Sequence, residues 1–155
     1  MTRDHGIDPA DILLIEDNPG DIHLIREALE KGSTDGSVPV ITDGAEALDY
    51  VDRWDDAGSA PAVVVLDLNL PKVDGKTILE AIRADPALRS VPVVVFSSSE
   101  SAEDIRETNH RGADGYHVKP VDPNEYIALV RAIAASVSDT GRPPPGAYST
   151  TDPIE

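Results

Sequence analysis

Cysteine is absent from this 155-residue sequence, so it can form neither a disulfide nor a thiolate metal site. Long apolar runs are absent too: no stretch approaches the ~20 apolar residues that a membrane-spanning helix needs. The first residues, Met1–Gly6, lack the apolar core of a signal peptide. We therefore expect a cytoplasmic protein, and its length favours a single domain.

Basic residues are scarce, because 13 lysines and arginines stand against 29 acids and leave a net charge of −16. Such a surface repels nucleic acids and anionic membranes, so direct binding to DNA is not expected. Two explanations of the acidity stay open: a basic partner, or halophilic adaptation to a salt-rich cytoplasm. Lysine supplies only four of the bases and the acids are spread along the chain, which favours salt adaptation.

Five short runs of aliphatic and β-branched residues predict strands. They are residues 11–15, 38–42, 62–66, 91–96 and 115–118. Pro39 in the second run favours an edge position, because proline cannot donate to a central ladder. The third run, Ala62–Leu66, is apolar without a break, which is typical of a strand buried on both faces of a parallel sheet.

Five segments with apolar residues at helical spacing alternate with these strands. Asn18 and Pro19 provide a cap and a first helical residue, and we expect this first helix to stop at Gly32. The later helices are expected to begin near Asp43, after an Asp74-Gly75 turn, near Ser101 and at Asp122. Strict alternation predicts an α/β fold, a doubly wound parallel sheet with helices on both faces and strand order 2-1-3-4-5.

The two ends of the chain differ from this core in composition. Residues 1–9 are polar with glycine and proline, and we expect a flexible arm there. Residues 139–155 are rich in proline, glycine, serine and threonine, which predicts disorder. The expected domain is therefore residues 10–138.

Polar side chains follow the predicted strands where each strand ends. Glu16 and Asp17 follow the first strand, Asp67 the third, Ser97 the fourth and Lys119 the fifth. Parallel strands end at one rim, so these groups are expected to meet at the switch point of the sheet. Two carboxylates ~4 Å apart repel by roughly 4 kcal/mol at an effective dielectric constant of about 20. The site must therefore hold a cation, take up a proton or use a basic residue.

Oxygen ligands with room for water suit Mg²⁺ or Mn²⁺. A carboxylate nucleophile, a divalent cation, a mobile positive charge and a hydroxyl donor are the parts that phosphoryl transfer requires. We therefore interpret Asp67 as a nucleophile that forms an aspartyl phosphate. Lys119 would attract the phosphoryl group and Ser97 would donate a hydrogen bond.

The segments at these strand ends resemble those of two-component response-regulator receiver domains, over residues 10–138. They are residues 13–18, 65–75, 94–98 and 115–120. The segments EDNPGD, LDLNLP and KPVD are similar to those of stand-alone receivers that pair with phytochrome-type and other sensor kinases. The resemblance implies a flavodoxin-like (βα)5 fold.

For phosphoryl transfer, the resemblance implies that Asp67 accepts the group from a phosphohistidine of a sensor histidine kinase. It implies that Mg²⁺ binds to Glu16, Asp17, the Asp67 carboxylate and the backbone carbonyl of Asn69. Glu16 is a mild departure from the family pattern, because glutamate stands here in place of aspartate, although both occur in the family.

For switching, the resemblance implies that Lys119 pairs with the phosphate and that Ser97 swings to bond it. Tyr116 then turns from exposed to buried in the space that Ser97 vacates. Ser97 is a second mild departure, because serine stands here in place of threonine, although both occur in the family.

A signalling module rather than an enzyme is thus expected, with an output by protein binding or by onward phosphotransfer. The alternative is a metal-dependent phosphohydrolase with an aspartate nucleophile. Those enzymes usually carry a second catalytic aspartate two residues on, where this chain has Asn69. In the last helix, Ile127 and Leu129 exceed the needs of one apolar face. They belong either to a wide core stripe or to a patch for a homodimer or a kinase.

Overall fold

The computed structural model describes residues 7–30, 37–54 and 60–148. The strands are β1 (Ile12–Ile15), β2 (Val40–Ile41), β3 (Val63–Leu66), β4 (Val93–Ser97) and β5 (Gly115–Val118). The helices are α1 (Pro19–Glu30), α2 (Gly44–Asp52), α3 (Gly75–Ala84), α4 (Ala102–His110) and α5 (Pro123–Thr140), after a 3-10 turn at Pro9–Asp11. Within the described residues, no helix combines the length and apolar character that crossing a membrane requires.

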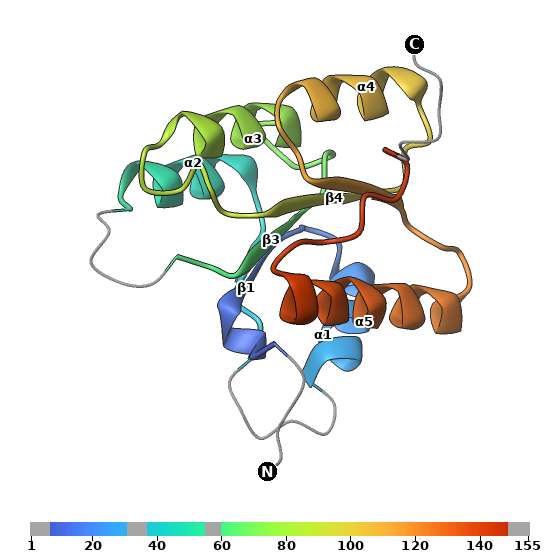
Figure 1. The fold of residues 1–155 in the computed structure, drawn as a ribbon. Coiled ribbons are helices and arrows are strands. Elements are labelled where there is room, and N and C mark those ends of the chain that lie inside the picture. The colour runs from blue at the N-terminus through green and yellow to red at the C-terminus, as the bar shows by residue number, and fades with distance from the viewer. Residues whose placement is uncertain (1–6, 31–36, 55–59, 149–155) are drawn as a thin grey trace.

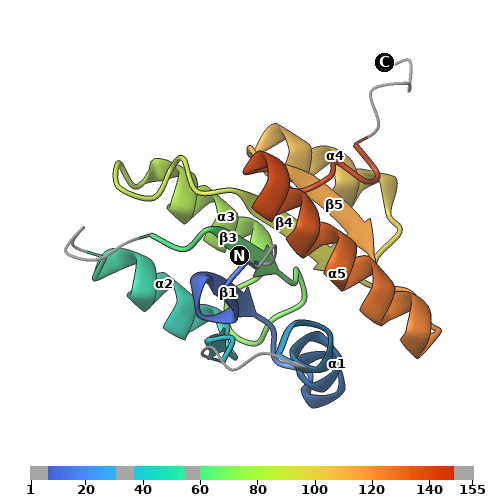
Figure 2. The ribbon, with the colours of Figure 1, turned by 60° about the horizontal axis from the view of Figure 1, so that its bottom comes forward.

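The strands form one parallel sheet in the order β2-β1-β3-β4-β5, which confirms the predicted topology. The short strand β2 lies at the edge, as Pro39 predicted. Helices α2, α3 and α4 cover one face of the sheet, and α1 and α5 cover the other (Figures 1 and 2). The Gly32 stop predicted for the first helix lies outside the described residues.

Both faces of the sheet are buried, because successive strand residues point to opposite faces. Leu13 and Ile15 pack into the apolar core beneath α2 and α3, whereas Ile12 and Leu14 pack into the core beneath α1 and α5. This explains why the strands carry unbroken apolar runs. Ile127 and Leu129 are half-buried against the second of these cores, which favours the wide core stripe over a free patch.

Side-chain caps start the helices where the sequence predicted them. The capping residues are Asn18, Asp43, Ser101 and Asp122, each accepting a bond from a backbone N–H in the first turn. Asp74, expected to form a turn, instead caps α3 by accepting from the backbone N–H of Thr77. The next residue, Gly75, lies so close to the sheet that a Cβ there would meet the backbone oxygen of Asp67 at 2.5 Å. Glycine therefore lets α3 begin directly against the end of β3.

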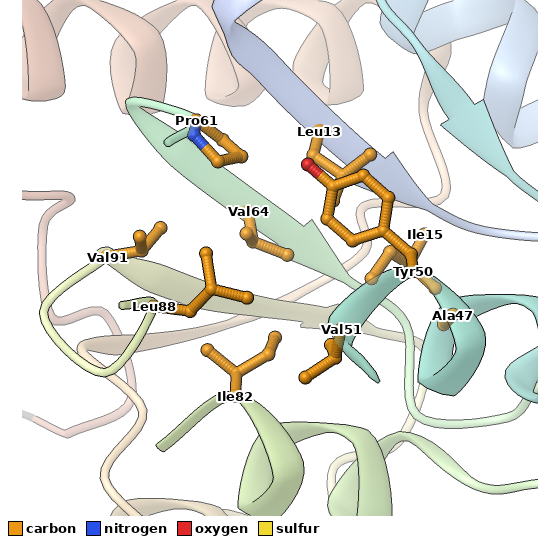
Figure 3. A pocket seen from close by; sticks show the side chains of 10 residues that line it. All are labelled: Leu13, Ile15, Ala47, Tyr50, Val51, Pro61, Val64, Ile82, Leu88 and Val91. Atoms are coloured by element: carbon orange, nitrogen blue, oxygen red, sulfur yellow. The ribbon is translucent and has the colours of Figure 1, made fainter. Parts of the chain in front are cut away.

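An apolar gap lies between the sheet and helices α2 and α3 (Figure 3). Its free volume is about 10 Å³, no more than one water needs. Its lining is almost wholly aliphatic, with side chains such as Leu13, Val64 and Leu88 pointing into it. It is a packing gap and not a ligand site, because an apolar space of this size stays dry.

Two segments expected to be flexible are ordered where the structure describes them. Ile7 packs against the core beneath α1 and α5, and Asp8 caps the 3-10 turn. At the other end, α5 continues to Thr140, and residues 141–148 (the C-terminal segment) lie along β5. The prediction of disorder from residue 139 is thus wrong up to Tyr148, and residues 149–155 lie outside the described chain.

The C-terminal segment adds a short parallel pairing to the free edge of β5. The Tyr116 N–H donates to the carbonyl oxygen of Pro145 at 3.2 Å, and the Ala147 N–H donates to the Tyr116 carbonyl oxygen at 2.8 Å. The His117 ring bonds the Pro144 carbonyl oxygen at 2.9 Å. Proline favours extended backbone, so a composition that predicts disorder also suits a segment that pairs with a sheet edge.

Substituting Gly146 by alanine is expected to detach this segment. Gly146 has φ +61°, and a Cβ there would meet the Tyr116 backbone oxygen at 2.3 Å. We expect a loss of about 1–3 kcal/mol in unfolding free energy from backbone strain and steric clash. The Ala147 amide should also lose its protection from hydrogen exchange. The matched control is Gly141→Ala, since Gly141 has φ +79° but nothing within 4 Å of a new Cβ. Equal effects of the two variants would contradict the pairing.

His117 is expected to make stability depend on pH. Burial lowers the pKa of His117, and the bond to Pro144 offsets only part of that effect. The folded protein therefore resists protonation that the unfolded chain accepts below about pH 6.5. The contribution of His117 to stability should be complete above that pH and fall as the pH decreases, by at most about 1.4 kcal/mol per pH unit. Denaturant titrations at pH 7.5 and 5.5 test this as the difference between the parent protein and His117→Gln, because buried Glu16, whose pKa is raised to about 7, titrates in the same range in both proteins and acts in the opposite direction. Exposed His110→Gln should match the parent.

Candidate functional site

The predicted site residues meet at the carboxyl rim of the sheet. Asp67 follows β3, and its backbone N–H donates to the Ile15 carbonyl oxygen at 3.0 Å, beside Glu16 and Asp17 at the end of β1. One oxygen from each of these three carboxylates lies within 4.8 Å of the others. Glu16 and Asp67 are 1% and 5% exposed, whereas Asp17 is open to solvent. The cluster predicted from the sequence is therefore assembled by the fold.

The donor set fits a hard divalent cation. All three groups are carboxylates, and such oxygens are the ligands that Mg²⁺ and Mn²⁺ favour. Buried Glu16 and Asp67 fix two of the ligands, while exposed Asp17 leaves one side of the cluster open to water. Mg²⁺ usually keeps several of its waters, so an open side suits it.

Lys119 reaches the same cluster from the end of β5. Its side chain is 8% exposed, and Nζ lies 2.8 Å from Glu16 Oε1, 3.0 Å from Asp21 Oδ2 and 3.6 Å from Asp67 Oδ2. Its backbone N–H donates to the Ser97 carbonyl oxygen at 2.9 Å, which fixes the start of the side chain at the rim. The predicted basic residue is thus in contact with the acids.

Burial and charge act together on the ionisation of this cluster. Burial raises the pKa of Glu16 to about 7, against the bond from Lys119, and the charge of Asp67 adds to the rise. For Lys119, burial opposes the charged form. Its bond to Glu16 and the charges of Glu16 and Asp67 more than offset that, so the pKa of Lys119 is raised. Lys119 therefore stays protonated, and the acids compete for its charge.

Ser97 and Tyr116 stand on the neighbouring strands β4 and β5. Both are fully buried, at 0% exposure. Ser97 Oγ accepts a bond from the Ser99 N–H at 3.1 Å, and the Tyr116 hydroxyl donates to the Ser99 carbonyl oxygen at 2.8 Å. The structure therefore has Tyr116 in the buried position, and its turn from exposed to buried when Ser97 moves stays a prediction. The C-terminal segment explains the burial, because Tyr148 packs its ring 6.1 Å from that of Tyr116 and covers it.

Asn69 follows Asp67 in an exposed position. Its backbone N–H points to Asp67 Oδ1 at 3.4 Å, a long contact that orients the carboxylate. The role predicted for the Asn69 carbonyl as a metal ligand stays a prediction.

Two residues of the site were missed by sequence reasoning. Neither Asp21 nor Tyr126 was singled out from the sequence. Asp21 contacts Lys119 and accepts a bond from the Tyr126 hydroxyl at 2.7 Å. The available indication was position: Asp21 stands in the first turn of α1, directly after the acids at the end of β1.

Comparison with known families settles the classification. The family model of the response regulator receiver domain matches residues 12–131. The chain belongs to this family. Receiver domains act in signalling, and this one has the flavodoxin-like fold with five parallel strands.

Two curated relatives resemble this receiver domain over most of their length. The probable methanogenesis regulatory protein FilR2 of Methanothrix harundinacea is 41% identical over 127 residues, which cover 81% of this chain and 82% of FilR2. Response regulator Rcp1 of Synechocystis is 30% identical over 127 residues, 81% of this chain and 86% of Rcp1.

Solved structures agree with the receiver fold. The phosphorylated cyanobacterial phytochrome response regulator RcpA is 35% identical with a TM-score of 0.75, and the match covers 83% of this chain and 93% of RcpA. The Mn²⁺-bound form of Rcp1 is 29% identical with a TM-score of 0.75, covering 86% of this chain and 97% of Rcp1. This receiver domain is therefore homologous to phytochrome-associated response regulators.

Proposed function

We propose that Asp67 is the phosphoacceptor of this receiver domain and takes its phosphoryl group from a phosphohistidine of a sensor histidine kinase. The observation that carries the proposal is the setting of Asp67. Its carboxylate is almost fully buried, shares a 4.8 Å cluster with Glu16 and Asp17, and lies 3.6 Å from the Lys119 ammonium. This setting supplies a carboxylate nucleophile together with the positive charge that phosphoryl transfer requires.

The reaction is an in-line displacement at phosphorus. An Asp67 carboxylate oxygen attacks the phosphorus, the phosphorus–nitrogen bond breaks, and its electron pair goes to the imidazole nitrogen of the kinase. Lys119 neutralises charge on the transferred oxygens, and the fixed backbone at the end of β3 orients the nucleophile. Ser97 supplies a hydroxyl donor, since accepting the bond from the Ser99 N–H leaves its own O–H able to donate.

A divalent cation belongs to this proposal, with Glu16, Asp17 and Asp67 as its side-chain ligands. Asn69 would add its backbone carbonyl. When bound, the cation supplies charge neutralisation at the phosphoryl oxygens. The Mn²⁺ in the structure of Rcp1 supports the choice of metal by likeness alone.

The output is proposed to be contact with another protein or onward phosphotransfer, without an enzymatic activity of its own. Phosphorylation adds nearly two negative charges beside Lys119 and would shift Ser97 and Tyr116. Although the core takes part of both side chains, a homodimer is proposed to use the remainder of Ile127 and Leu129 that the last helix leaves exposed.

Incubation with acetyl phosphate and Mg²⁺ tests the function. A receiver gains one acid-labile phosphoryl group per chain, which intact-protein mass spectrometry detects before and after acid treatment. A phosphohydrolase would instead release phosphate from many substrates over many turnovers. Absence of any label on a folded, Mg²⁺-saturated protein would refute the proposed function.

The acidic composition is proposed to reflect life in a salt-rich cytoplasm. With a net charge of −16, self-repulsion opposes folding at low salt. Screening by simple salt is nearly complete at about 1 M, where the Debye length is about 3 Å. A melting temperature that keeps rising with KCl beyond that concentration would support salt adaptation. A plateau at lower salt would favour the alternative of a basic partner.

A further inference from the structure

Asp21 lies outside the three-acid cluster but engages the same lysine. Its Oδ2 is 3.0 Å from Lys119 Nζ, and its Oδ1 accepts a hydrogen bond from the Tyr126 hydroxyl at 2.7 Å. Its backbone N–H donates to the Asn18 side chain at 3.0 Å, where α1 begins. Both carboxylate oxygens thus have a partner, so the carboxylate cannot turn without breaking a bond.

Tyr126 provides a rigid anchor on α5. It is 3% exposed, and its ring packs edge-on against Phe96 with centroids 5.1 Å apart. Burial raises the pKa of Tyr126, and the bond to Asp21 raises it further, so the hydroxyl keeps its proton and stays a donor. The Tyr126 hydroxyl therefore donates to Asp21 over the whole range of pH in which the protein works.

Three carboxylates compete for one ammonium group. Lys119 Nζ lies nearest to Glu16 and Asp21, and farthest from Asp67 at 3.6 Å. Glu16 belongs to the cluster suited to a cation, whereas Asp21 does not. A cation bound to the cluster would therefore compete with Lys119 for Glu16 and Asp67, but not for Asp21.

We propose that Asp21, fixed by Tyr126, is a positioning residue that holds the Lys119 ammonium back from Asp67 and thereby slows phosphoryl transfer to Asp67. This inference rests on the proposed function, since it concerns the rate of that reaction. To neutralise an incoming phosphoryl group, Lys119 gives up part of its contact with Asp21. The negative charge of Asp21 also repels the incoming group, so both effects raise the barrier.

Phosphorylation rates measure the effect. Rates with acetyl phosphate at saturating Mg²⁺ are compared for the parent protein, Asp21→Asn and Tyr126→Phe. Asp21→Asn removes the charge and keeps the shape, and a gain of roughly threefold to tenfold is expected. Tyr126→Phe frees Asp21 without removing its charge, so its gain should be smaller. Glu27→Gln is the matched control, because it removes one charge from the outer side of α1, where Glu27 pairs with His23.

A second measurement follows Lys119 itself, without metal or phosphate. The Lys119 ammonium is buried, so its ¹⁵N resonance can be observed by NMR. Asp21→Asn and Tyr126→Phe should both shift this resonance and speed its hydrogen exchange, and Glu27→Gln should not. A merely structural role of Asp21 in starting α1 would lower stability without changing the Lys119 signal.

The outcomes separate the two proposals. A parent protein that takes no label defeats the proposed function, while the NMR comparison still tests the hold of Asp21 on Lys119. A labelled parent with an Asp21→Asn rate equal to or below its own overturns the inference alone. The inference also fails if Glu27→Gln gains as much rate as Asp21→Asn, or if the Lys119 resonance does not change.

Discussion

Asp67→Asn is expected to reduce phosphorylation to background. An amide oxygen is neutral and cannot form a stable acyl phosphate, so the nucleophile is lost while the shape of the side chain is kept. The variant should fold, because the Asp67 charge contributes to the raised pKa of Glu16, and removing that charge relieves repulsion in a buried cluster. Intact-protein mass spectrometry after acetyl phosphate treatment gives the result, and a thermal melt confirms folding.

Asp122→Asn is the control for this experiment. Asp122 caps α5 by accepting bonds from the Asn124 and Glu125 backbones, and asparagine caps helices about as well as aspartate. Its phosphorylation should equal that of the parent. If Asp67→Asn still takes up a full phosphoryl group at the parental rate, the nucleophile is another residue.

Asp17→Asn is expected to weaken Mg²⁺ binding by about 10- to 100-fold. Affinity for a hard cation depends on the number of charged oxygen ligands, and the variant removes one of three. Asp17 is exposed, so its replacement costs little stability and the change in affinity reports on the metal site. Isothermal titration with Mg²⁺ or Mn²⁺ measures it.

Asp11→Asn makes the same change of charge at the opposite end of β1. Asp11 is also exposed and lies away from the carboxyl rim. Asp17→Asn and Asp11→Asn each remove one negative charge, but only Asp17 belongs to the cluster. The affinity of Asp11→Asn for Mg²⁺ should therefore stay near that of the parent. An unchanged affinity in Asp17→Asn would remove Asp17 from the ligand set.

The sheet and its rim were predictable because they follow from short-range rules. Unbroken apolar runs predict buried parallel strands, and parallel strands end at one rim. Asp67 and Lys119 are 52 positions apart (119 − 67), yet the strand ends alone bring them to 3.6 Å.

Features that depend on packing between helices were not predictable in this way. Asp21 meets the Tyr126 hydroxyl because α1 and α5 lie side by side, and no sequence pattern reports how two helices pack against each other. The ordered C-terminal segment was missed because its proline-rich composition is the same in a free tail and in a paired edge. For the same reason the sequence did not indicate that Tyr148 and Pro145 of this segment would contact Tyr116.

The family match stops at residue 131, inside α5, whose buried Ile133 and Val137 come later. A protein trimmed to the family boundaries would lose these two anchors and the C-terminal segment that covers Tyr116 at the sheet edge. Its sheet edge would be bare, and its switch residues would sit in a different solvent environment. Biophysical work on signalling by this receiver should therefore keep the chain at least through Tyr148.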